Sequence, residues 1–435
     1  MGTVLSEAPG GRPLPPASLV WLVWGLGACL YLIAFYQRVA PAVITQELSR
    51  EFHLSAAALG NLSAFYFYSY VAGQIPTGVI ADRWGPRRLL TAGAALTALG
   101  TLLFALAPNV TLANVGRLLI GAAGGVAFVS MLKIASHWMA ARQFAFASGM
   151  ALFIGVVGAT LAGAPLRVAV DAFGWRGVMV ASAAVTALVA VAIWIVVRDD
   201  PSERGYSSHF PESARSGAAT SIASDLREVF RYRNIRILLL APAAFSSLLL
   251  SFAGLWGVPF LAMHYGFTTT QAATIASAML IAWSASSLGW GHVSERLQRR
   301  KPVMIGGLLA TLGLWAVVLY VPDLSRFTLV ALLIAVGIAA GSFVLTFAFA
   351  KESVPARLGG TASGIANMGV MIGGMVMQPL IGLVLDMNWS GIMANGARWY
   401  AFEAFQRGFS LVLAWGAFSL VLLAFAHETH CRQSR

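Results

Sequence analysis

Four basic side chains lie within long apolar stretches of the sequence, where a charge must be paired, hydrated or used for binding. They are Arg38, Arg117, Lys133 and Arg167. A guanidinium in such a place is suited to bind a carboxylate, because its planar fork can donate two parallel hydrogen bonds. None of the 17 Asp and Glu residues falls in the core of an apolar stretch. The residue types therefore predict an anion-binding site rather than acid–base catalysis.

Arg38 is the strongest candidate for contact with an anion. It is preceded by Ala34-Phe35-Tyr36 and followed by Val39-Ala40-Pro41-Ala42, so it does not end its apolar stretch. A charge inside a membrane span costs about 2.5–3.5 kcal/mol on insertion scales unless it is paired or hydrated. We expect this side chain to point into a central cavity, and the alternative is that it snorkels to the membrane interface.

The other three cations allow more ordinary interpretations. For Arg117 we expect structural pairing inside its helix bundle. Lys133 is either a second anion contact or a snorkelling anchor near the end of its helix. Arg167 and Asp171 are spaced i,i+4, so we expect them to pair with each other.

Polar and aromatic residues offer a lining for the same site. Tyr66, Tyr70, Gln74 and Gly78 follow one another at steps of four and so share one helix face. Helix packing alone could explain the tyrosines, but an unpaired amide facing lipid is costly, which favours a cavity for Gln74. In the second half of the chain the comparable candidates are Trp256, Trp283, Asn367 and Gln378.

The elements that must position these residues are membrane helices. Of 435 residues, 58% are hydrophobic and 11% charged, with a mean hydropathy of +0.75. Soluble domains have about 45–50% apolar and about 25% charged residues, so a soluble protein is excluded. Since a span needs about 20 apolar residues, the length suits about a dozen. We place spans near 19–45, 56–80, 89–107, 111–134, 145–167, 177–197, 236–262, 270–291, 303–321, 327–350, 361–385 and 407–426.

This reading predicts an all-α membrane protein with two bundles of six helices. The bundles are expected at 19–197 and 235–427, with polar tails at 1–18 and 428–435. They are joined by a polar linker at 198–234, which is either unstructured or carries a short helix from Asp225 to Arg231. In that helix Leu226, Val229 and Phe230 would form one apolar face on the inner leaflet.

The net charge of +12 is explained by membrane orientation. Of the 29 Lys and Arg residues, twenty lie in loops and tails on the side of both termini, and five lie in loops on the other side. Cytoplasmic loops carry such an excess, so both termini are expected in the cytoplasm of a bacterial inner membrane. We therefore expect no nucleic-acid partner, and the natural partners are the bilayer and a small molecule.

A glycine-rich motif with acidic and basic residues occurs once in each half of the chain. The two copies begin at Gly78 and Gly291, 213 residues apart. Each contains Gly, an acid four residues further on, Arg directly after the acid, and a later basic group. Repeats of this kind build transporters around a site at the bilayer midplane. The motif residues are Gly78, Asp82, Arg83, Gly85, Arg87 and Arg88 in the first copy and Gly291, Glu295, Arg296 and Arg299 in the second.

The first copy resembles the signature between helices two and three of the major facilitator superfamily, with Pro86 in place of a basic residue. Arg117 with Gly121 is similar to the fourth-helix motif of that superfamily. The resemblance implies two pseudo-symmetric bundles that work by alternating access. It also implies that Asp82 contacts span eleven near Gly360-Thr361. By pseudo-symmetry, Glu295 should contact span five near Gln143.

Such contacts would latch the outward-open form, since they exist in only one access state. The alternative is that the motif only anchors the loop by its positive charge. That suits Arg87 and Arg88 but leaves Asp82 unexplained.

The setting of Arg38 resembles the first helix of organic-anion transporters in this superfamily, in which an arginine contacts substrate. We therefore expect transport of a small organic anion or a zwitterionic metabolite. The lack of an acidic relay in the spans favours a facilitator or exchanger over proton coupling.

Three alternatives remain: an amino-acid or dipeptide facilitator, a drug/H+ exporter, and a membrane sensor or scaffold. We expect no enzyme, cofactor or metal site, because no cluster of Asp, Glu, His or Cys lies in the spans. The protein is expected to be a monomer.

Overall fold

A computed structural model describes residues 13–209, 222–394 and 396–433. Within these ranges the side chains of a few helical residues, Gly78 and Asp82 among them, are not described. Eleven helices of the described part are long and apolar enough to cross a membrane. The part of α3 before Gly85 would span about 40 Å at 1.5 Å per residue, so the structure is consistent with twelve spans.

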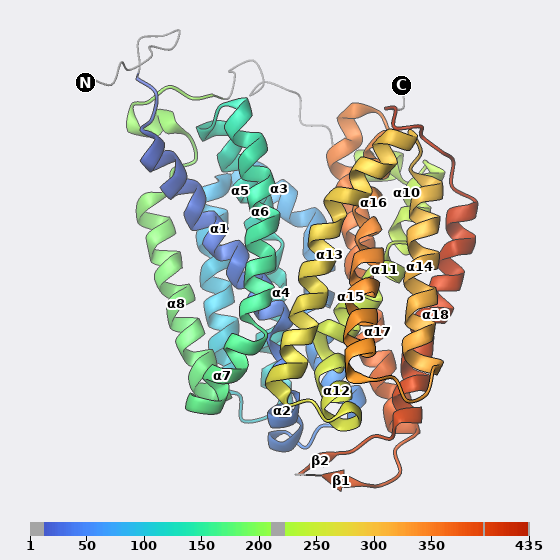
Figure 1. Ribbon diagram of the computed structural model, residues 1–435. Helices are drawn as coiled ribbons and strands as arrows, with labels where there is room; N and C mark the ends of the chain where they lie inside the picture. The colour runs from blue at the N-terminus through green and yellow to red at the C-terminus, as the bar shows by residue number, and fades with distance from the viewer. Residues whose placement is uncertain (1–12, 210–221, 395, 434–435) are drawn as a thin grey trace.

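The first half of the chain forms one bundle, drawn in blue to green in Figure 1. Its elements are α1 (Ala17–Val39), η1 (Ala40–Val43), α2 (Thr45–Glu51), α3 (Ala56–Leu106), α4 (Val110–Gly124), α5 (Val126–Trp138), α6 (Ala141–Leu161), α7 (Ala164–Phe173) and α8 (Trp175–Val196). Long apolar sequences form these helices because a helix satisfies every backbone polar group internally, as a bilayer requires.

The second half forms the other bundle, drawn in yellow-green to red, beside the first. After η2 (Pro201–Arg204) and α9 (Ile222–Val229), its elements are α10 (Arg233–Leu240), α11 (Ala243–Leu248), η4 (Leu249–Trp256), α12 (Gly257–Tyr265), α13 (Thr269–Leu297), α14 (Lys301–Tyr320), α15 (Arg326–Ala340), η5 (Gly341–Val344), α16 (Leu345–Glu352), η6 (Ala356–Leu358), α17 (Gly359–Met387), β1 (Met393–Ala394), β2 (Ala397–Arg398) and α18 (Phe402–Ala424).

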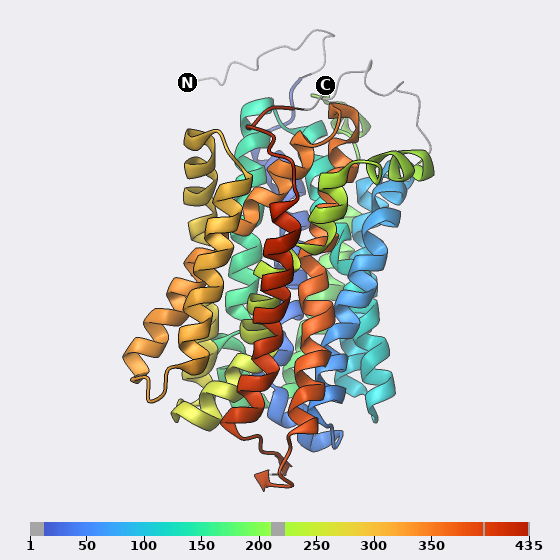
Figure 2. The ribbon, with the colours of Figure 1, turned by 90° about the vertical axis from the view of Figure 1, so that its right-hand side faces the viewer.

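The two ends of the molecule are easily told apart. We call the end where α1 begins and α18 finishes the terminal end, and the opposite end, which carries α2 and the β1–β2 hairpin, the far end (Figures 1 and 2). The bundles touch closely at the far half, because a Cβ on Gly60 would overlap the backbone of Gln378 and one on Gly382 would overlap Ala56. Towards the terminal end the helices α6 and α13 diverge (Figure 1).

The segment expected as a loop between spans two and three is helical on both sides of a single kink, which corrects the sequence-based boundaries. The kink lies at Gly85, whose φ of 78° and ψ of 157° favour glycine. The next helical segment begins at Pro86, and the carboxylate of Asp199 accepts a hydrogen bond from the backbone N–H of Arg87 at 2.6 Å. An acid just beyond α8 thus caps the start of the third span.

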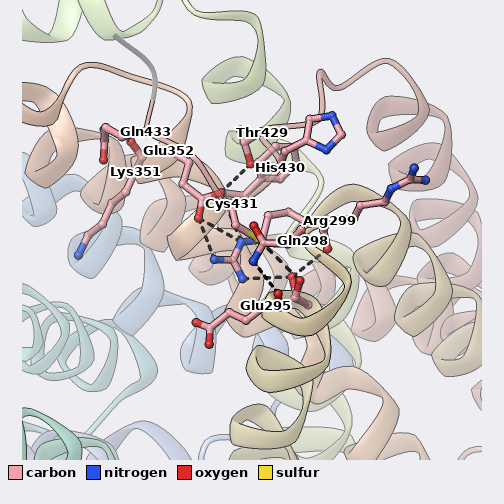
Figure 3. A network of polar contacts seen from close by, with 12 residues as sticks. Glu295, Gln298, Arg299, Lys351, Glu352, Thr429, His430, Cys431 and Gln433 are labelled. Carbon is pink, nitrogen blue, oxygen red and sulfur yellow. Dashed lines mark hydrogen bonds and ion pairs between the residues drawn. The ribbon is translucent and has the colours of Figure 1, made fainter.

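The second bundle repeats this arrangement at its own terminal end. The carboxylate of Glu428, just beyond α18, accepts hydrogen bonds from the backbone N–H groups of Arg300 and Lys301 at 2.8 and 3.0 Å. Around it, Arg300 pairs with Glu352 at 2.8 Å, and Thr429 donates to Glu352 at 2.6 Å (Figure 3). The segment after the last span therefore ties the ends of α14, α16 and α18 together.

The linker between the bundles contains a helix, α9, rather than only unstructured chain. Val229 is buried against the second bundle rather than placed on a leaflet-facing surface, and Phe230 lies beyond the helix and is exposed. Arg357 pairs with Asp225 at 3.7 Å and with Glu228. The hydrogen bond from Arg357 holds the pKa of the Glu228 carboxyl below its ordinary value.

Replacing Gly85 by Ala tests the kink. We expect Gly85→Ala to lower the unfolding temperature of the purified protein, because a positive φ costs an L-residue about 1–2 kcal/mol and the new Cβ overlaps the Asp199 carboxylate. Tryptophan fluorescence during heating measures the change. The matched control is Gly289→Ala in α13, where a Cβ meets nothing within 4 Å. Equal unfolding temperatures for the two variants would contradict the account.

Candidate functional site: a guanidinium among aromatic rings

Arg38 lies one residue before the end of α1, where the chain turns into η1 at Pro41. Its side chain is buried, with 6% of the residue exposed. The guanidinium carbon lies 4.2 Å from the ring centre of Phe35, 5.2 Å from that of Tyr70 and 5.5 Å from that of Tyr66. Three aromatic faces therefore surround the charge and stabilise it by cation–π attraction.

Hydrogen bonding leaves most of the Arg38 guanidinium free. Its Nε donates to the hydroxyl of Tyr66 at 3.3 Å. Within the described residues, the two terminal nitrogens make no hydrogen bond, and no Asp or Glu side chain lies within ion-pair distance of Arg38. The cation is thus desolvated and held in place by rings, with the donors that bind a carboxylate still available.

Arg117 approaches the same tyrosine from α4, and both of its terminal nitrogens have acceptors, whereas its buried Nε has no hydrogen-bond partner among the described residues. Its guanidinium carbon lies 5.3 Å from the ring centre of Tyr66. Its terminal nitrogens donate to the backbone carbonyls of Gln37, at 2.6 Å, and Ser63, at 3.3 Å. With 1% of the residue exposed, Arg117 joins α1, α3 and α4. Both hydrogen bonds of Arg117 therefore go to main-chain groups of neighbouring helices.

The site continues across the boundary between the bundles. Asn367 of α17 donates through its amide nitrogen to the Tyr70 hydroxyl at 3.3 Å and to Gln74 Oε1 at 3.1 Å. Tyr70 also stacks on Tyr66, with ring centres 5.8 Å apart. A chain of contacts therefore runs from Arg38 of the first bundle to Asn367 of the second.

A second aromatic group from the C-terminal bundle faces these tyrosines. Phe343 and Phe347 pack against the buried cluster that contains Tyr66 and Tyr70. Trp283 of α13 stacks on Phe343, with ring centres 4.3 Å apart and the planes inclined by 29°. Trp283 therefore belongs to the outer layer of the site rather than to its contact with Arg38.

Two of the expected lining residues instead hold the second bundle together. Trp256 Nε1 donates to the backbone carbonyl of Gln378 at 3.1 Å. Gln378 Nε2 donates to the carbonyl of Leu250 at 2.7 Å, and both side chains are buried. Leu250 lies in the π-helical segment η4, whose wider turns free a carbonyl for such a bond.

The remaining cations lie away from Arg38. Lys133 Nζ donates to the carbonyl of Ala81 at 2.8 Å, which joins α5 to α3 near the terminal end. Arg167 pairs with Asp171, and also with Glu47 at 2.6 Å. The second acid was not anticipated, because Glu47 lies on a different helix, α2.

The motif residues give a mixed result. The surroundings of Gly78 and the side chain of Asp82 are outside the part that the structure describes. Arg87 donates to the carbonyl of Trp194 at 2.7 Å and lies 4.2 Å from the ring centre of that tryptophan. Arg83 and Arg88 are exposed.

In the second copy of the motif, Gly291 is half-buried, and Glu295, Arg296 and Arg299 are exposed. No hydrogen bond joins Glu295 to Gln143 in the described part of the chain. Gln143 instead accepts one from the backbone N–H of Ala140 at the start of its own helix, at 3.3 Å.

Sequence reasoning missed the aromatic ring nearest the charge, that of Phe35, and the two phenylalanines of the second bundle that pack against the tyrosines. Phe35 was available as a signal, because it lies three residues before Arg38 on the same helix face. Phe343 and Phe347 lie four residues apart, and nothing in their spacing relates them to α1. Only the packing of the two bundles brings them to Tyr66 and Tyr70.

The model of the Major Facilitator Superfamily matches residues 26–378 of this sequence. The chain belongs to this superfamily. It is therefore a membrane transporter and not an enzyme, as the sequence predicted, and its fold class is confirmed. The resemblance first noted in the glycine-rich motif thus extends over most of the chain.

Individual proteins of known name are more distant. The chain is 24% identical to a Cupriavidus necator protein named "Probable sulfoacetate transporter SauU", over 85% of this chain and 88% of that protein. It is 25% identical to the 3-(3-hydroxy-phenyl)propionate transporter of Escherichia coli, over 88% and 92%. A crystal structure of a bacterial homologue of the human lysosomal transporter Spinster has the same fold, with a TM-score of 0.75, 18% identity and coverage of 94% and 97%.

The two hydrogen bonds made by the terminal nitrogens of Arg117 predict a loss of stability when the guanidinium is replaced. We expect Arg117→Lys to lower the unfolding temperature, since one ammonium cannot replace two guanidinium bonds to separate carbonyls, each worth about 1.5–3 kcal/mol. The measurement is thermal unfolding in detergent. Arg38→Lys is the matched comparison and should unfold close to the unaltered protein. A larger loss for Arg38→Lys than for Arg117→Lys would contradict these assignments.

Proposed function

We propose that this protein is a bacterial inner-membrane transporter that carries a small organic anion by alternating access, with the carboxylate of the anion bound by Arg38. It acts as a monomer, with both termini in the cytoplasm. Facilitated diffusion or exchange of anions is the expected mode, since no acidic proton relay was found in the spans by sequence.

The single observation that carries this proposal is the state of the Arg38 guanidinium. It is buried, and its terminal nitrogens have no hydrogen-bond acceptor among the described residues. A desolvated cation of this kind is costly unless something completes its hydrogen bonds. An anionic substrate would do so when bound, and water would do so when the site is empty.

The orientation is supported by the distribution of charge. The terminal end carries the long linker and the tails, with most of the Lys and Arg residues. Because cytoplasmic loops retain positive charge, we assign the terminal end to the cytoplasm and the far end to the outside.

The names of the relatives support an organic anion. Sulfoacetate and 3-(3-hydroxyphenyl)propionate, the compounds in those names, both carry a carboxylate. A zwitterionic amino acid is the second candidate, but its ammonium would need an acceptor. Near Arg38 the described residues offer only neutral groups, such as Gln74 and Asn367. An anion without an ammonium therefore suits the site better.

Transport into proteoliposomes tests the proposal. A thermal-shift screen of carboxylates, amino acids and neutral amides first identifies a ligand, since binding to the native state raises its stability. Uptake of that ligand is then compared for the unaltered protein, Arg38→Lys and Arg38→Ala. We expect Arg38→Ala to lower uptake at least about tenfold, as for loss of a hydrogen bond to a charged group, and Arg38→Lys to retain part of it.

The matched control is Arg231→Ala, which removes an exposed arginine from the linker. Its uptake should equal that of the unaltered protein. Unchanged uptake by Arg38→Ala would refute the assignment of Arg38, and stabilisation by neutral amides but by no carboxylate would refute the anionic substrate.

A further inference from the structure

The carboxylate of Asp386 connects the two bundles at the far end. It lies at the last turn of α17 in the second bundle and accepts hydrogen bonds from the backbone N–H groups of Ala56, at 3.0 Å, and Ala57, at 2.8 Å. These residues begin α3 in the first bundle. Arg398 donates to the same carboxylate at 3.0 Å, and Tyr400 donates to it at 2.8 Å.

The start of α3 is only partly capped from within its own bundle. The hydroxyl of Ser55 accepts from the N–H of Ala58 at 3.3 Å. The N–H groups of Ala56 and Ala57 are satisfied instead by Asp386, and Ala56 also donates to the hydroxyl of Tyr400 at 3.1 Å. A carboxylate at a helix start gains from the N–H donors and from the helix dipole together. When the bundles part at the far end, both gains are lost.

Among the described residues, the symmetry-related half of the far end shows no such contact. By internal symmetry the counterpart of Asp386 is Asp171, at the end of α7. Asp171 pairs with Arg167 of its own helix. The start of α13 is capped by its own residues Thr268 and Gln271, which exchange hydrogen bonds. A carboxylate therefore caps a helix across the bundle boundary between α17 and α3, but not at the symmetry-related place between α7 and α13.

We propose that Asp386 is a latch that holds the far end closed by capping α3 across the bundle boundary, with Tyr400 and Arg398 as the groups that position its carboxylate. The latch sets the balance between far-end-closed and far-end-open states and does not depend on the identity of the substrate. If the latch proposal is wrong, the assignment of Arg38 as the anion site is unaffected. If that assignment is wrong, the latch proposal is likewise unaffected.

Distance measurements by pulsed electron paramagnetic resonance test the latch without substrate. Spin labels are attached to Phe173→Cys and Phe327→Cys, on the far ends of α7 and α15, where the native side chains are 78% and 85% exposed. The background carries Cys29→Ser and Cys431→Ser. We expect Asp386→Ala to raise the ratio of long to short distances by roughly tenfold, as for loss of charged hydrogen bonds.

Matched variants separate a latch from a general structural role. Tyr400→Phe keeps the ring and removes one hydroxyl, so it should shift the distances in the same direction but less. Asp171→Ala removes an acid at the symmetry-related place and should leave the distances unchanged. Thermal unfolding of each variant identifies any that fails to fold, and Tyr400→Phe then provides the decisive reading. Unchanged distances in Asp386→Ala and Tyr400→Phe, or an equal shift in Asp171→Ala, would overturn the proposal.

Discussion

The burial of one guanidinium without a carboxylate partner is the constraint around which the centre of this transporter is organised. Removing the Arg38 guanidinium from water costs free energy. Among the described residues, three aromatic rings and one tyrosine hydroxyl, rather than an acid, offset part of that cost. Compensation is therefore incomplete. An anion bound at the site would accept hydrogen bonds from the free nitrogens of Arg38 and offset the rest of the cost, which favours binding.

The same constraint explains why Tyr66 is central. The centre of its ring lies 5.5 Å from the guanidinium carbon of Arg38 and 5.3 Å from that of Arg117, yet the two arginines have different partners. The terminal nitrogens of Arg117 donate to backbone carbonyls and join three helices, so that Tyr66 and Arg38 are held in one arrangement. The contact from Tyr70 to Asn367 then links this rigid group to the other bundle, which must move during transport.

Much of this organisation could be predicted from the sequence. Apolar length predicted the membrane helices, the repeated motif predicted two related halves, and helical spacing placed Tyr66, Tyr70 and Gln74 on one face. Other features could not be predicted. The helix on both sides of Gly85 depends on the cap from Asp199, more than a hundred residues away. The bond from Asp386 to α3 likewise joins residues 330 positions apart, and no local pattern indicates it.

The sequence by itself determined that this is a multi-span membrane protein with cations, but no acids, in the cores of its predicted apolar stretches, because hydrophobicity and charge act residue by residue in a bilayer. Tertiary structure decided which of those cations is free. Arg38 and Arg117 are both arginines within apolar stretches, and packing distinguishes them: backbone carbonyls accept from the terminal nitrogens of Arg117, whereas those of Arg38 lie among aromatic rings without an acceptor in the described residues. Whether a guanidinium is available to a ligand depends on the groups that surround it, and the packing of the helices determines those groups.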